Sequence, residues 1–482
     1  MARELVVWLF AERVGVLRLA NAQLEFQYET TWLNSPQAVS ISSSLPLQTE
    51  PFTHTQCRSF FAGLLPDGTP RQVIAKQLQI SRQNDFAMLE GIGGECAGAI
   101  TFLPPGQLPR SDSDDVKWLS EDALVTVLDA IPRRPLLAVD GLRLSLAGAQ
   151  DKLPVVVSAT FEIGLALNGM PSTHILKTAI ASSDITESVA NEAFCMALAE
   201  VMKLAPAKSK IHLVRDRQVY LVERYDRTGA PTRRLHQEDF CQALGIAPEC
   251  KYQSEGGPSL AQCFELVRRV TRPSAPHVLR LLDYVIFNAL IGNHDAHGKN
   301  FSLLYSGNRT TLAPLYDALS TSVYPTLTEK MAMKIGSKYK FSEVMARHWD
   351  RFAESCGLSK SQTSKRILEL AQQLPIAAHA LQKRPDFANL PLIEKIVTVI
   401  DKRSAVTTNK LNALISYEAK LAQNADRNNE ASVGVEMTAL EKASAQPLAE
   451  EPYRAMAADK TREAEAMEWC NGLAGDMTDA TR

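Results

Sequence analysis

The sequence predicts an α+β protein, and three patterns along the chain carry that prediction. The first is a set of short β-prone apolar runs separated by polar turns, at residues 5–10, 14–17 and 24–28. The second is a return of strand-like runs over residues 141–235, interrupted by one helical pattern. The third is apolar spacing typical of helices through most of residues 236–422.

These patterns divide the ordered part of the chain into four segments. Residues 1–105 form a β-rich N-terminal subdomain, in which residues 60–78 already have helical spacing. Residues 106–140 form a linker with a helix, since prolines, a glycine and a run of Ser and Asp mark this region. The third segment, 141–235, contains predicted strands at 153–157, 174–177 and 219–222 and a helix at 188–202. The fourth, 236–422, contains predicted helices at 278–291, 359–374 and 392–421.

The last segment, residues 423–482, has a different composition. It is rich in Ala, Glu and Asn, and its acidic residues outnumber its basic residues 12 to 6. Such a segment buries too little apolar surface to offset the entropy lost on ordering. We therefore expect a largely disordered tail, in which only residues 455–469 have the pattern of a short amphipathic helix.

The composition narrows the class of protein. The chain has 482 residues, of which 45% are hydrophobic and 22% charged, as in globular proteins. A formal net charge of −2 argues against broad, sequence-independent attraction to nucleic acid. No apolar run reaches the length of a membrane span, and the first residues lack a signal-peptide pattern. The eight cysteines have no paired spacing, which indicates reduced thiols and a cytoplasmic location.

The most informative segment is residues 292–300, with the sequence GNHDAHGKN. It places Asp295 and Asn300 five positions apart, and Asp317 follows 22 positions after Asp295. Phosphoryl transfer needs a carboxylate near the attacking hydroxyl and oxygen ligands for Mg²⁺. We expect Asp295 to orient the hydroxyl, and Asn300 and Asp317 to bind Mg²⁺. Lys299 would add positive charge near the phosphates. The alternative is that each aspartate only caps a turn.

A candidate phosphate cradle lies at residues 145–152, with the sequence SLAGAQDK. Small residues let backbone N–H groups approach phosphate oxygens, although such a turn is more often only structural. Lys177 ends a predicted strand and could reach the nucleotide phosphates, and Glu192 on the next helix could pair with it. The alternative for Lys177 is a solvated side chain, and Glu187 and Glu200 also lie on or near that helix.

Two competing motifs fit less well. His294 and His297 lie three apart, but zinc needs a third or fourth nitrogen or sulfur ligand, which is not nearby in sequence. Residues 292–299 are a near-match to a Walker loop, but five residues rather than four separate the glycines, and Asn follows the lysine. We therefore favour Mg²⁺ and a different nucleotide loop.

Seven segments, in the same order, resemble motifs of the HipA-type serine/threonine kinase toxins of bacterial toxin–antitoxin modules. They are residues 42–47, 85–99, 145–152, 174–177, 223–226, 292–300 and 316–317. The resemblance as a whole covers residues 1 to about 420, which makes it more specific than any single motif. It implies a β-rich N-terminal subdomain joined to a two-lobed kinase related to phosphatidylinositol kinases. Residues 141–235 would be the nucleotide-binding lobe and residues 236–422 an all-helical catalytic lobe.

The resemblance also implies a role for individual residues. The backbone of residues 223–225 would hold adenine, Asp295 would be the catalytic acid/base, and Ser145 would be autophosphorylated, which would expel the nucleotide loop. The implied ATP-binding residues are Ala147, Gly148, Ala149, Gln150, Asp151, Lys152, Lys177, Glu223, Arg224, Tyr225, His297, Gly298, Lys299, Asn300, Tyr316 and Asp317.

The implied function is that of an ATP- and Mg²⁺-dependent serine/threonine protein kinase acting as a toxin. It would arrest growth by phosphorylating a translation factor such as an aminoacyl-tRNA synthetase. A small HipB-like helix-turn-helix antitoxin would neutralise it and would carry it to DNA, and no membrane would be involved. Two alternatives stay open: a non-catalytic antitoxin-binding co-repressor and a small-molecule kinase. Residues 94–96, Gly-Glu-Cys, depart from the Arg-Asp pair more usual in the family.

Overall fold

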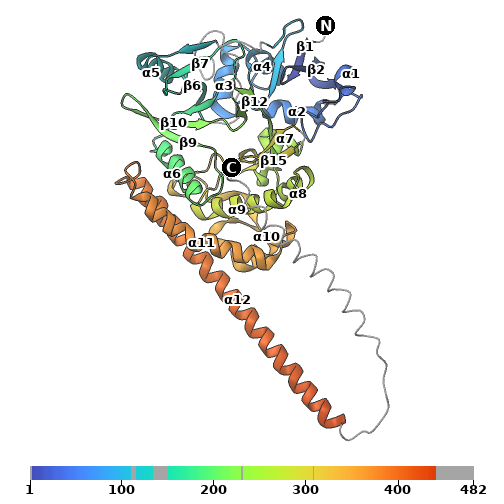
Figure 1. Ribbon diagram of the computed structural model, residues 1–482, viewed down its shortest axis with the longest axis vertical. Coiled ribbons are helices and arrows are strands. Elements are labelled where there is room, and N and C mark those ends of the chain that lie inside the picture. The colour runs from blue at the N-terminus through green and yellow to red at the C-terminus, as the bar shows by residue number, and fades with distance from the viewer. Residues whose placement is uncertain (1–2, 110–114, 134–149, 230–231, 308, 441–482) are drawn as a thin grey trace. The chain divides into compact units, whose positions relative to one another are not determined.

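We describe the fold from a computed structural model (Figure 1). It describes residues 3–109, 115–133, 150–229, 232–307 and 309–440. Described residues up to Leu414 form one compact unit, and helix α12 continues from this unit into a second that starts at Ile415. Among these described residues, no helix is both long enough and apolar enough to cross a bilayer.

The N-terminal part is built on a four-stranded antiparallel sheet in the order β3-β2-β1-β4. Its strands are β1 (Arg3–Leu9), β2 (Glu12–Ala20), β3 (Gln23–Tyr28) and β4 (Ile100–Leu103). The helices of this part are α1 (Thr30–Leu33), α2 (His54–Gly63), α3 (Gly68–Gln77) and α4 (Asp85–Ile92). The three strands and the helical region predicted from apolar spacing are therefore confirmed.

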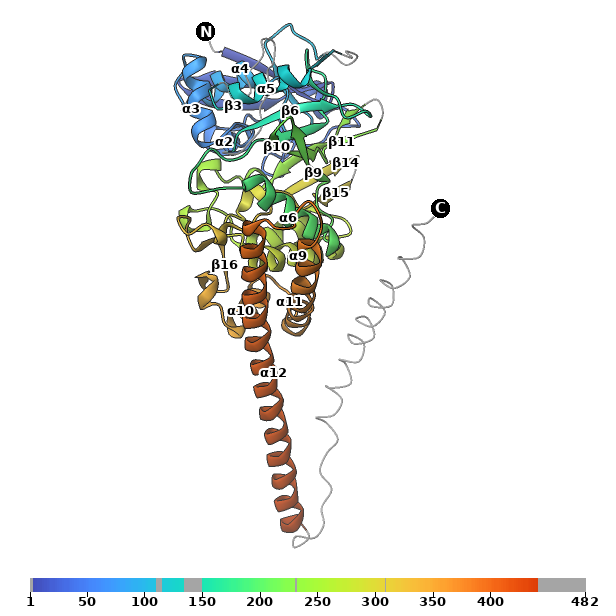
Figure 2. The ribbon, with the colours of Figure 1, turned by 90° about the vertical axis from the view of Figure 1, so that its left-hand side faces the viewer.

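The second sheet has six strands in the order β5-β7-β6-β8-β10-β9. These are β5 (Val116–Trp118), β6 (Lys152–Val157), β7 (Ile163–Ala166), β8 (His174–Lys177), β9 (Ser209–Val214) and β10 (Arg217–Glu223). Two helices belong to this region, α5 (Glu121–Ala130) and α6 (Ser188–Val201). In Figure 2, α6 lies beneath this sheet, and it contacts β9 and β10. The three predicted strands and the predicted helix are confirmed, whereas β5, β7 and β9 were missed.

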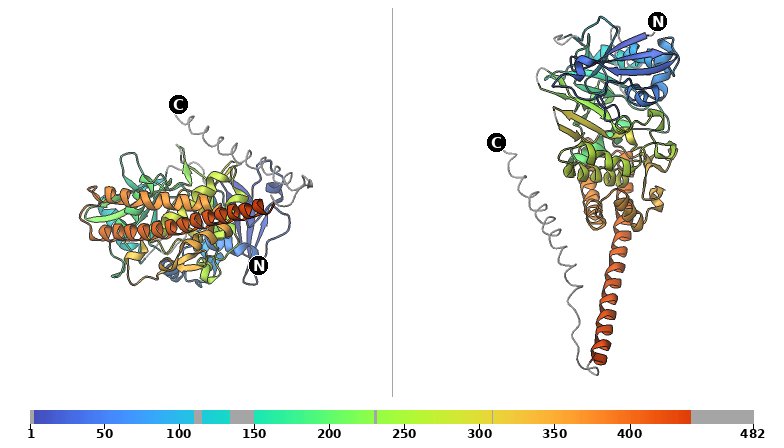
Figure 3. Two further views of the ribbon diagram at one scale, coloured as in Figure 1. Left: turned by 90° about the horizontal axis from the view of Figure 1, so that it is seen from below. Right: turned by 90° about the vertical axis from the view of Figure 1, so that its right-hand side faces the viewer.

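The remaining part combines helices with short strands. Its helices are α7 (Phe240–Ala243), α8 (Leu260–Val270), α9 (Ala275–Ile291), α10 (Ala346–Ser355), α11 (Lys360–Gln382) and α12 (Pro391–Leu440). Its strands are β13 (His236–Asp239), β14 (Ser302–Ser306), β15 (Arg309–Leu312), β16 (Lys330–Ile335) and β17 (Lys338–Lys340), which follow the two-residue strands β11 (Arg227–Thr228) and β12 (Arg233–Arg234). Figure 3 (right) shows helices α8 to α11 on the side of the β13-β14-β15 sheet that faces away from the N-terminal sheet.

Two predictions for this part are wrong. The lobe over residues 236–422 is not all-helical, because β13, β14 and β15 form a three-stranded sheet and β16 pairs with β17. Strands of three to six residues carry too short an apolar pattern to be told from helix by periodicity. The disordered tail also does not begin at residue 423, since α12 is helical through Leu440. Its Ala, Glu and Lys residues are strong helix formers. The predicted amphipathic helix at 455–469 lies outside the described residues.

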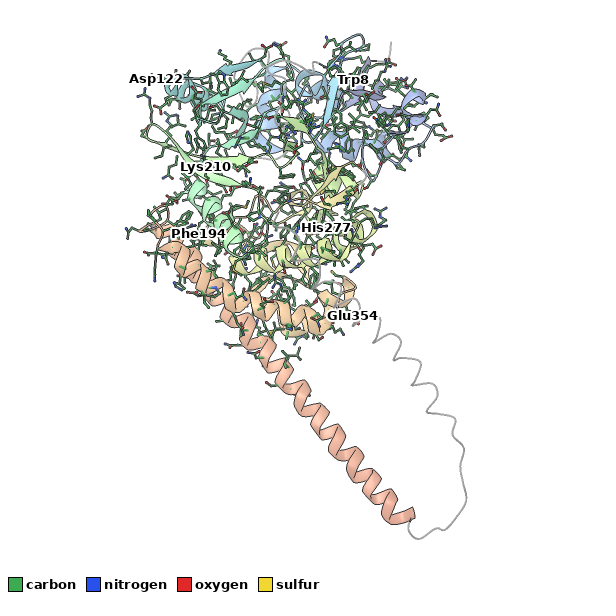
Figure 4. All side chains as sticks on the ribbon, in the orientation of Figure 1. Trp8, Asp122, Phe194, Lys210, His277 and Glu354 are labelled. Atoms are coloured by element: carbon green, nitrogen blue, oxygen red, sulfur yellow. The ribbon has the colours of Figure 1, made fainter. Side chains whose placement is uncertain are left out.

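Strand β10 connects the two hydrophobic cores. Its alternate residues Val219 and Leu221 pack into the core of the N-terminal sheet, and Tyr220 and Val222 pack into the core formed with the helices. Phe194 of α6, labelled in Figure 4, belongs to the second core and packs against Phe387 with ring centroids 5.2 Å apart. With both faces buried, β10 holds the segment that follows it, residues 223–226, at a fixed place between the two cores.

Candidate functional site

Lys177, the last residue of β8, is buried beside two carboxylates. Its Nζ lies 2.6 Å from Glu192 Oε1 on α6 and 2.7 Å from Asp317 Oδ1. The predicted pairing with Glu192 is therefore present. Burial alone would lower the pKa of Lys177, but Asp317 and Glu192 raise it well above its ordinary value. The lysine is fully charged at neutral pH and is fixed in position.

Asp317 faces the same cavity. Its backbone has φ = 58°, a left-handed conformation that Asp tolerates better than most residues. Burial alone would raise the pKa of Asp317, but the Lys177 ammonium lowers it to about 2, so the side chain is an anion. Asn300 Nδ2 donates to Asp317 Oδ2 at 3.4 Å and to the backbone carbonyl oxygen of Asp295, also at 3.4 Å. One amide thus bridges the two acidic residues that the sequence singled out.

The loop that carries Asp295 follows directly from the end of α9. Helix α9 ends at Gly292 with φ = 80°, and a Cβ atom there would lie 2.0 Å from Ser322 Oγ, so the position requires glycine. Asn293 Oδ1 then accepts a hydrogen bond of 3.0 Å from the backbone N–H of Asp295. The Asp295 side chain is 43% exposed, which leaves it accessible to an incoming group.

Tyr252 is a site residue that sequence reasoning missed. Its hydroxyl donates a hydrogen bond of 2.6 Å to Asp295 Oδ1, and its ring packs edge-on against His297. Burial raises the pKa of Asp295, whereas the hydrogen bond from Tyr252 and the charge of Lys251 lower it. Burial and Lys251 lower the pKa of His297 to about 3, so this histidine is neutral. Tyr252 is 43 residues before Asp295 in an irregular segment, and no pattern in the sequence links the two.

These residues share one cavity of about 430 Å³. Gln150, Lys152, Lys177, Glu223, Arg224, Tyr225, Asp295, His297, Lys299, Asn300, Tyr316 and Asp317 all line it, together with apolar side chains that include Ile175, Met196, Val222 and Leu319. The cavity therefore has a charged end, with the lysines and acids, and an apolar wall. This combination suits a nucleotide, whose base is apolar on both faces and whose phosphates are anionic.

Lys152 and Lys299 are two further lysines that line the cavity. Lys152 lies opposite Lys177 across the β6–β8 register, and burial together with Lys177 lowers the pKa of Lys152 to about 8. Lys299 was expected near the phosphates, but its Nζ is paired at 2.9 Å with Asp67 of the N-terminal part. Asp67 also lines the cavity, so the N-terminal part contributes a charged side chain to its wall.

The segment after β10 is held by a buried network of charges. Arg224 Nη2 lies 2.8 Å from Asp226 Oδ2, which also accepts a hydrogen bond of 2.7 Å from the Gly98 backbone N–H. Glu95 Oε1 lies 3.3 Å from Arg224 Nη1 and 3.0 Å from Arg227 Nη2. All four charged side chains are 4% exposed or less. The network connects residues 95–98 to the segment at which adenine was expected.

The other residues predicted to bind ATP make the following contacts. Tyr225 and Tyr316 pack together with ring centroids 5.6 Å apart. Gln150 Nε2 donates to the Thr178 carbonyl oxygen at 3.1 Å. Gly298 is enclosed, since a Cβ atom there would lie 2.4 Å from Pro258. Asp151 is half-buried, which raises its pKa, and it is not among the residues that line the cavity. Ser145, Ala147, Gly148 and Ala149 lie outside the described residues.

The donors at the charged end fit Mg²⁺. Carboxylate and amide oxygens are hard ligands, and Mg²⁺ is commonly held by one or two protein oxygens together with substrate phosphates. Asp317 supplies an anionic carboxylate and Asn300 an amide within 3.4 Å of it. The two side chains could hold the ion between them and the phosphates.

Comparisons with known proteins indicate the family of this chain. The sequence family described as the HipA N-terminal domain matches residues 5–103, and the HipA-like C-terminal domain matches residues 144–378. The protein Y4mE of Sinorhizobium fredii is 45% identical over 377 residues, which cover 76% of this chain and 89% of that protein. The serine/threonine-protein kinase toxin HipA of Shewanella oneidensis is 29% identical over 367 residues, which cover 73% of this chain and 82% of the toxin.

A solved structure of a HipA protein has a similar fold. HipA of Shewanella oneidensis MR-1, solved with HipB and its operator DNA, has a TM-score of 0.73 to this chain at 25% identity. The superposition covers 85% of this chain and 98% of that one. The fold and the buried lysine–glutamate pair define a kinase-like protein. The two domain matches and the relatives make the assignment specific: this chain belongs to the HipA family.

Proposed function

We propose that this protein is an ATP- and Mg²⁺-dependent serine/threonine protein kinase that acts as the toxin of a toxin–antitoxin module. The observation that carries the proposal is the single cavity shared by the Lys177–Glu192 pair, Asp295, Asn300 and Asp317. A protein kinase needs these functions together: a cation for the phosphates, oxygen ligands for metal and a carboxylate for the attacking hydroxyl.

Each group then has one task. ATP lies with its base against the apolar wall and the backbone of residues 223–225, and its phosphates lie toward Lys177. Asn300 and Asp317 would hold Mg²⁺, which would neutralise phosphate charge when bound. Lys152 adds positive charge to the cavity wall, and Lys299, although it is paired with Asp67, also lines the cavity. Asp295 is exposed enough to accept a hydrogen bond from the acceptor hydroxyl.

The transfer step balances with these groups. The acceptor oxygen forms a bond to the γ-phosphorus of ATP, and the bond from that phosphorus to the β–γ bridging oxygen breaks. ADP leaves with the bonding electron pair, and the hydroxyl proton passes to Asp295. Tyr252 orients the carboxylate of Asp295 for this step by a hydrogen bond. The neighbouring His297 is neutral and so does not form an ion pair with Asp295.

Three further parts of the proposal rest on the family. Ser145 is the site of autophosphorylation, where a dianionic group beside the nucleotide loop would repel ATP. The substrate in the cell is a translation factor such as an aminoacyl-tRNA synthetase, and the protein acts in the cytoplasm. The similar HipA was solved with HipB and operator DNA, and a small helix-turn-helix antitoxin is the corresponding partner here. Contact with DNA is then mainly through that antitoxin.

Phosphorylation of the purified protein tests the proposal directly. Incubation with ATP and Mg²⁺ should add one phosphoryl group, detected by intact-mass measurement and assigned to Ser145 by peptide analysis. Asp295→Asn and removal of Mg²⁺ with a chelator should each abolish the gain, and Ser145→Ala should remove the site. Asp401→Asn is the matched control, because Asp401 is exposed and pairs only with His379 among the described residues. No mass gain with any divalent metal would contradict the proposal.

A growth assay distinguishes the toxin from its alternatives. Expression of the wild-type chain should arrest growth, and Asp295→Asn should relieve the arrest. Equal inhibition by both chains would instead favour a non-catalytic binding subunit. ATP consumption that rises with a metabolite extract, but not with protein substrates, would favour a small-molecule kinase.

A further inference from the structure

His294, the residue directly before Asp295, makes hydrogen bonds through its backbone N–H, its carbonyl oxygen and both ring nitrogens. Its backbone N–H donates to Thr321 Oγ1 at 2.8 Å, and its carbonyl oxygen accepts from the Ala332 N–H at 2.8 Å. Its ring Nδ1 lies 3.0 Å from the carbonyl oxygen of Thr328. Its ring Nε2 lies 2.7 Å from Arg403 Nη2. The side chain is buried, so each of these contacts constrains the position of the loop.

Arg403 brings helix α12 into contact with this loop. Its Nη1 donates a hydrogen bond of 2.7 Å to the carbonyl oxygen of Ala289, in the last turn of α9. Its guanidinium group also lies over the Phe341 ring, 4.4 Å from the centroid. One side chain from α12 therefore binds both the end of α9 and the loop that follows it. The planar guanidinium suits this task because its N–H groups point in fixed, diverging directions.

The ring of His294 is satisfied in one protonation state only. A carbonyl oxygen accepts but cannot donate, so Nδ1 carries the proton that is shared with Thr328. Nε2 is then a lone-pair acceptor for the Arg403 N–H. Burial and the charge of Arg403 lower the pKa of His294 to about 4, in agreement with a neutral ring. A protonated His294 would lose its contact with Arg403 and face a like charge.

We propose that Arg403 is a positioning residue for phosphoryl transfer, which acts by holding His294 and so fixes the backbone that presents Asp295. This inference rests on the proposed kinase function and adds to it a residue of α12. The matched C-terminal domain model ends at residue 378, so Arg403 lies outside the residues that this model matches. Helix α12 is on this basis a component of the active-site scaffold.

The first test separates kcat from KM. Arg403→Met removes both hydrogen bonds and keeps an apolar stem against Phe341. It should lower kcat roughly 10- to 100-fold, because a small displacement of a reacting group is costly. KM for ATP should stay within about twofold, since Arg403 does not line the nucleotide cavity. Arg403→Lys retains the positive charge but not the planar guanidinium group with its diverging N–H donors, so it should recover only part of kcat.

Lys410→Met is the matched control. Lys410 is also a cation of α12, and its Nζ donates a hydrogen bond of 2.6 Å to the Val344 carbonyl oxygen, outside the loop that carries Asp295. This variant should retain kcat. If Arg403→Met lowers kcat no more than Lys410→Met does, the positioning role is wrong.

A double-mutant cycle tests whether Arg403 acts through His294. His294→Asn keeps a donor for Thr328 but removes the acceptor for Arg403. If the two residues act as one unit, the double variant should lose no more kcat than the worse single variant. Losses that multiply would overturn the proposal. Guanidinium ion, added far below unfolding concentrations, should raise kcat of Arg403→Ala and leave Lys410→Ala unchanged.

Hydrogen exchange supplies a measurement that needs no catalysis. Amides of residues 292–297 should exchange faster in Arg403→Met than in Lys410→Met, because the loop loses its contact with α12. Unchanged exchange in Arg403→Met would contradict the proposal. If the wild-type chain transferred no phosphate, the kinase function would fail, and faster exchange in this loop would still show that Arg403 holds it.

Discussion

Lys177 and Asp317 are separated by 140 positions in the chain, yet Lys177 Nζ lies 2.7 Å from Asp317 Oδ1. The same ammonium group lies 2.6 Å from Glu192 Oε1. One buried cation therefore balances two carboxylates from different elements, and it joins β8, α6 and the segment after β15 into one site. Removing a partner from a buried ion pair leaves the other charges uncompensated, which is more costly than the pair itself is favourable.

Replacement of Lys177 tests this arrangement. Under the proposed function, Lys177→Met should lower kinase activity more than 100-fold, because it removes the cation proposed to bind the phosphates. It should also lower the free energy of unfolding by about 3 kcal/mol, since the buried Glu192 carboxylate loses its counter-charge, whereas the 38% exposed Asp317 side chain is partly screened by solvent. Denaturant unfolding and a phosphotransfer assay measure the two effects. The double variant Lys177→Met/Glu192→Leu should recover part of the stability and none of the activity. Recovery of both would show that Lys177 has no role in transfer.

Replacement of Tyr252 tests the environment of Asp295. Tyr252→Phe removes the hydrogen bond of 2.6 Å that stabilises the Asp295 carboxylate, so the pKa of Asp295 should rise. The base form then needs a higher pH, and the acid limb of the kcat profile should move upward. At neutral pH we expect a loss of roughly 10-fold in kcat, the equivalent of about 1.4 kcal/mol. Tyr339→Phe is the control, because Tyr339 lies on β17. A pH profile identical to that of the wild type would contradict the assignment.

Replacement of Glu95 tests whether the N-terminal part supports nucleotide binding. Glu95→Gln keeps an oxygen acceptor for Ser172 but removes the negative charge that faces Arg224 and Arg227. The buried guanidinium groups lose a counter-charge, so the free energy of unfolding should fall by about 3 kcal/mol. KM for ATP should rise more than kcat falls, because Arg224 belongs to the segment that lines the nucleotide cavity.

The control for this prediction is a second ion pair. Asp283 binds Arg366 through two hydrogen bonds of 2.7 and 2.9 Å, and neither residue lines the nucleotide cavity. Asp283→Asn should lower stability without changing KM for ATP. If both variants raise KM equally, the effect of Glu95 is one of general stability and not of the nucleotide segment.

The sequence predicted which residues meet in one cavity where the expected chemistry restricts the residue types. Asp295, Asn300 and Asp317 could be recognised because phosphoryl transfer needs a carboxylate and hard metal ligands at a short spacing. Lys177 and Glu192 could be paired because a strand and the following helix bring them to one place. Tyr252 and Arg403 could not, because their positions depend on tertiary packing, and many tyrosines and arginines in the chain fit the same local pattern.

The fold was predictable where apolar periodicity is long. Strands β1 to β3 and helices α9 and α11 were recovered because several buried residues repeat at the strand or helix period. Strands β13 to β17 were not, because each has only three to six residues and is stabilised by its partner strands. The continuation of α12 past residue 423 was not predicted, because the polar composition of residues 423–440 is typical of disorder although several of these residues favour helix.

The dependence of stability on pH tests the burial of His236. Its Nε2 lies 2.8 Å from the carbonyl oxygen of Ile41, its ring stacks on Tyr305, and it is 2% exposed. Burial lowers the pKa of His236 to about 4, below its ordinary value of about 6.5. The unfolded chain therefore binds the proton more readily. The stabilisation by the neutral ring is complete above pH 6.5 and is lost as the pH falls toward 4. Each pH unit in this window should cost up to about 1.4 kcal/mol from this one residue.

Denaturant unfolding at pH 7 and pH 5 measures this loss. His236→Gln keeps an N–H donor for Ile41 but cannot be protonated, so it should lose less stability than the wild type between the two pH values. His379→Gln, at an exposed histidine, should behave as the wild type does. The other buried histidines of the described residues are His277, His294, His297 and His348, and their pKa values are lowered in the same direction. They remain in all three chains, so the difference between the variants isolates His236. An equal loss in His236→Gln and the wild type would mean that His236 is not held neutral by burial.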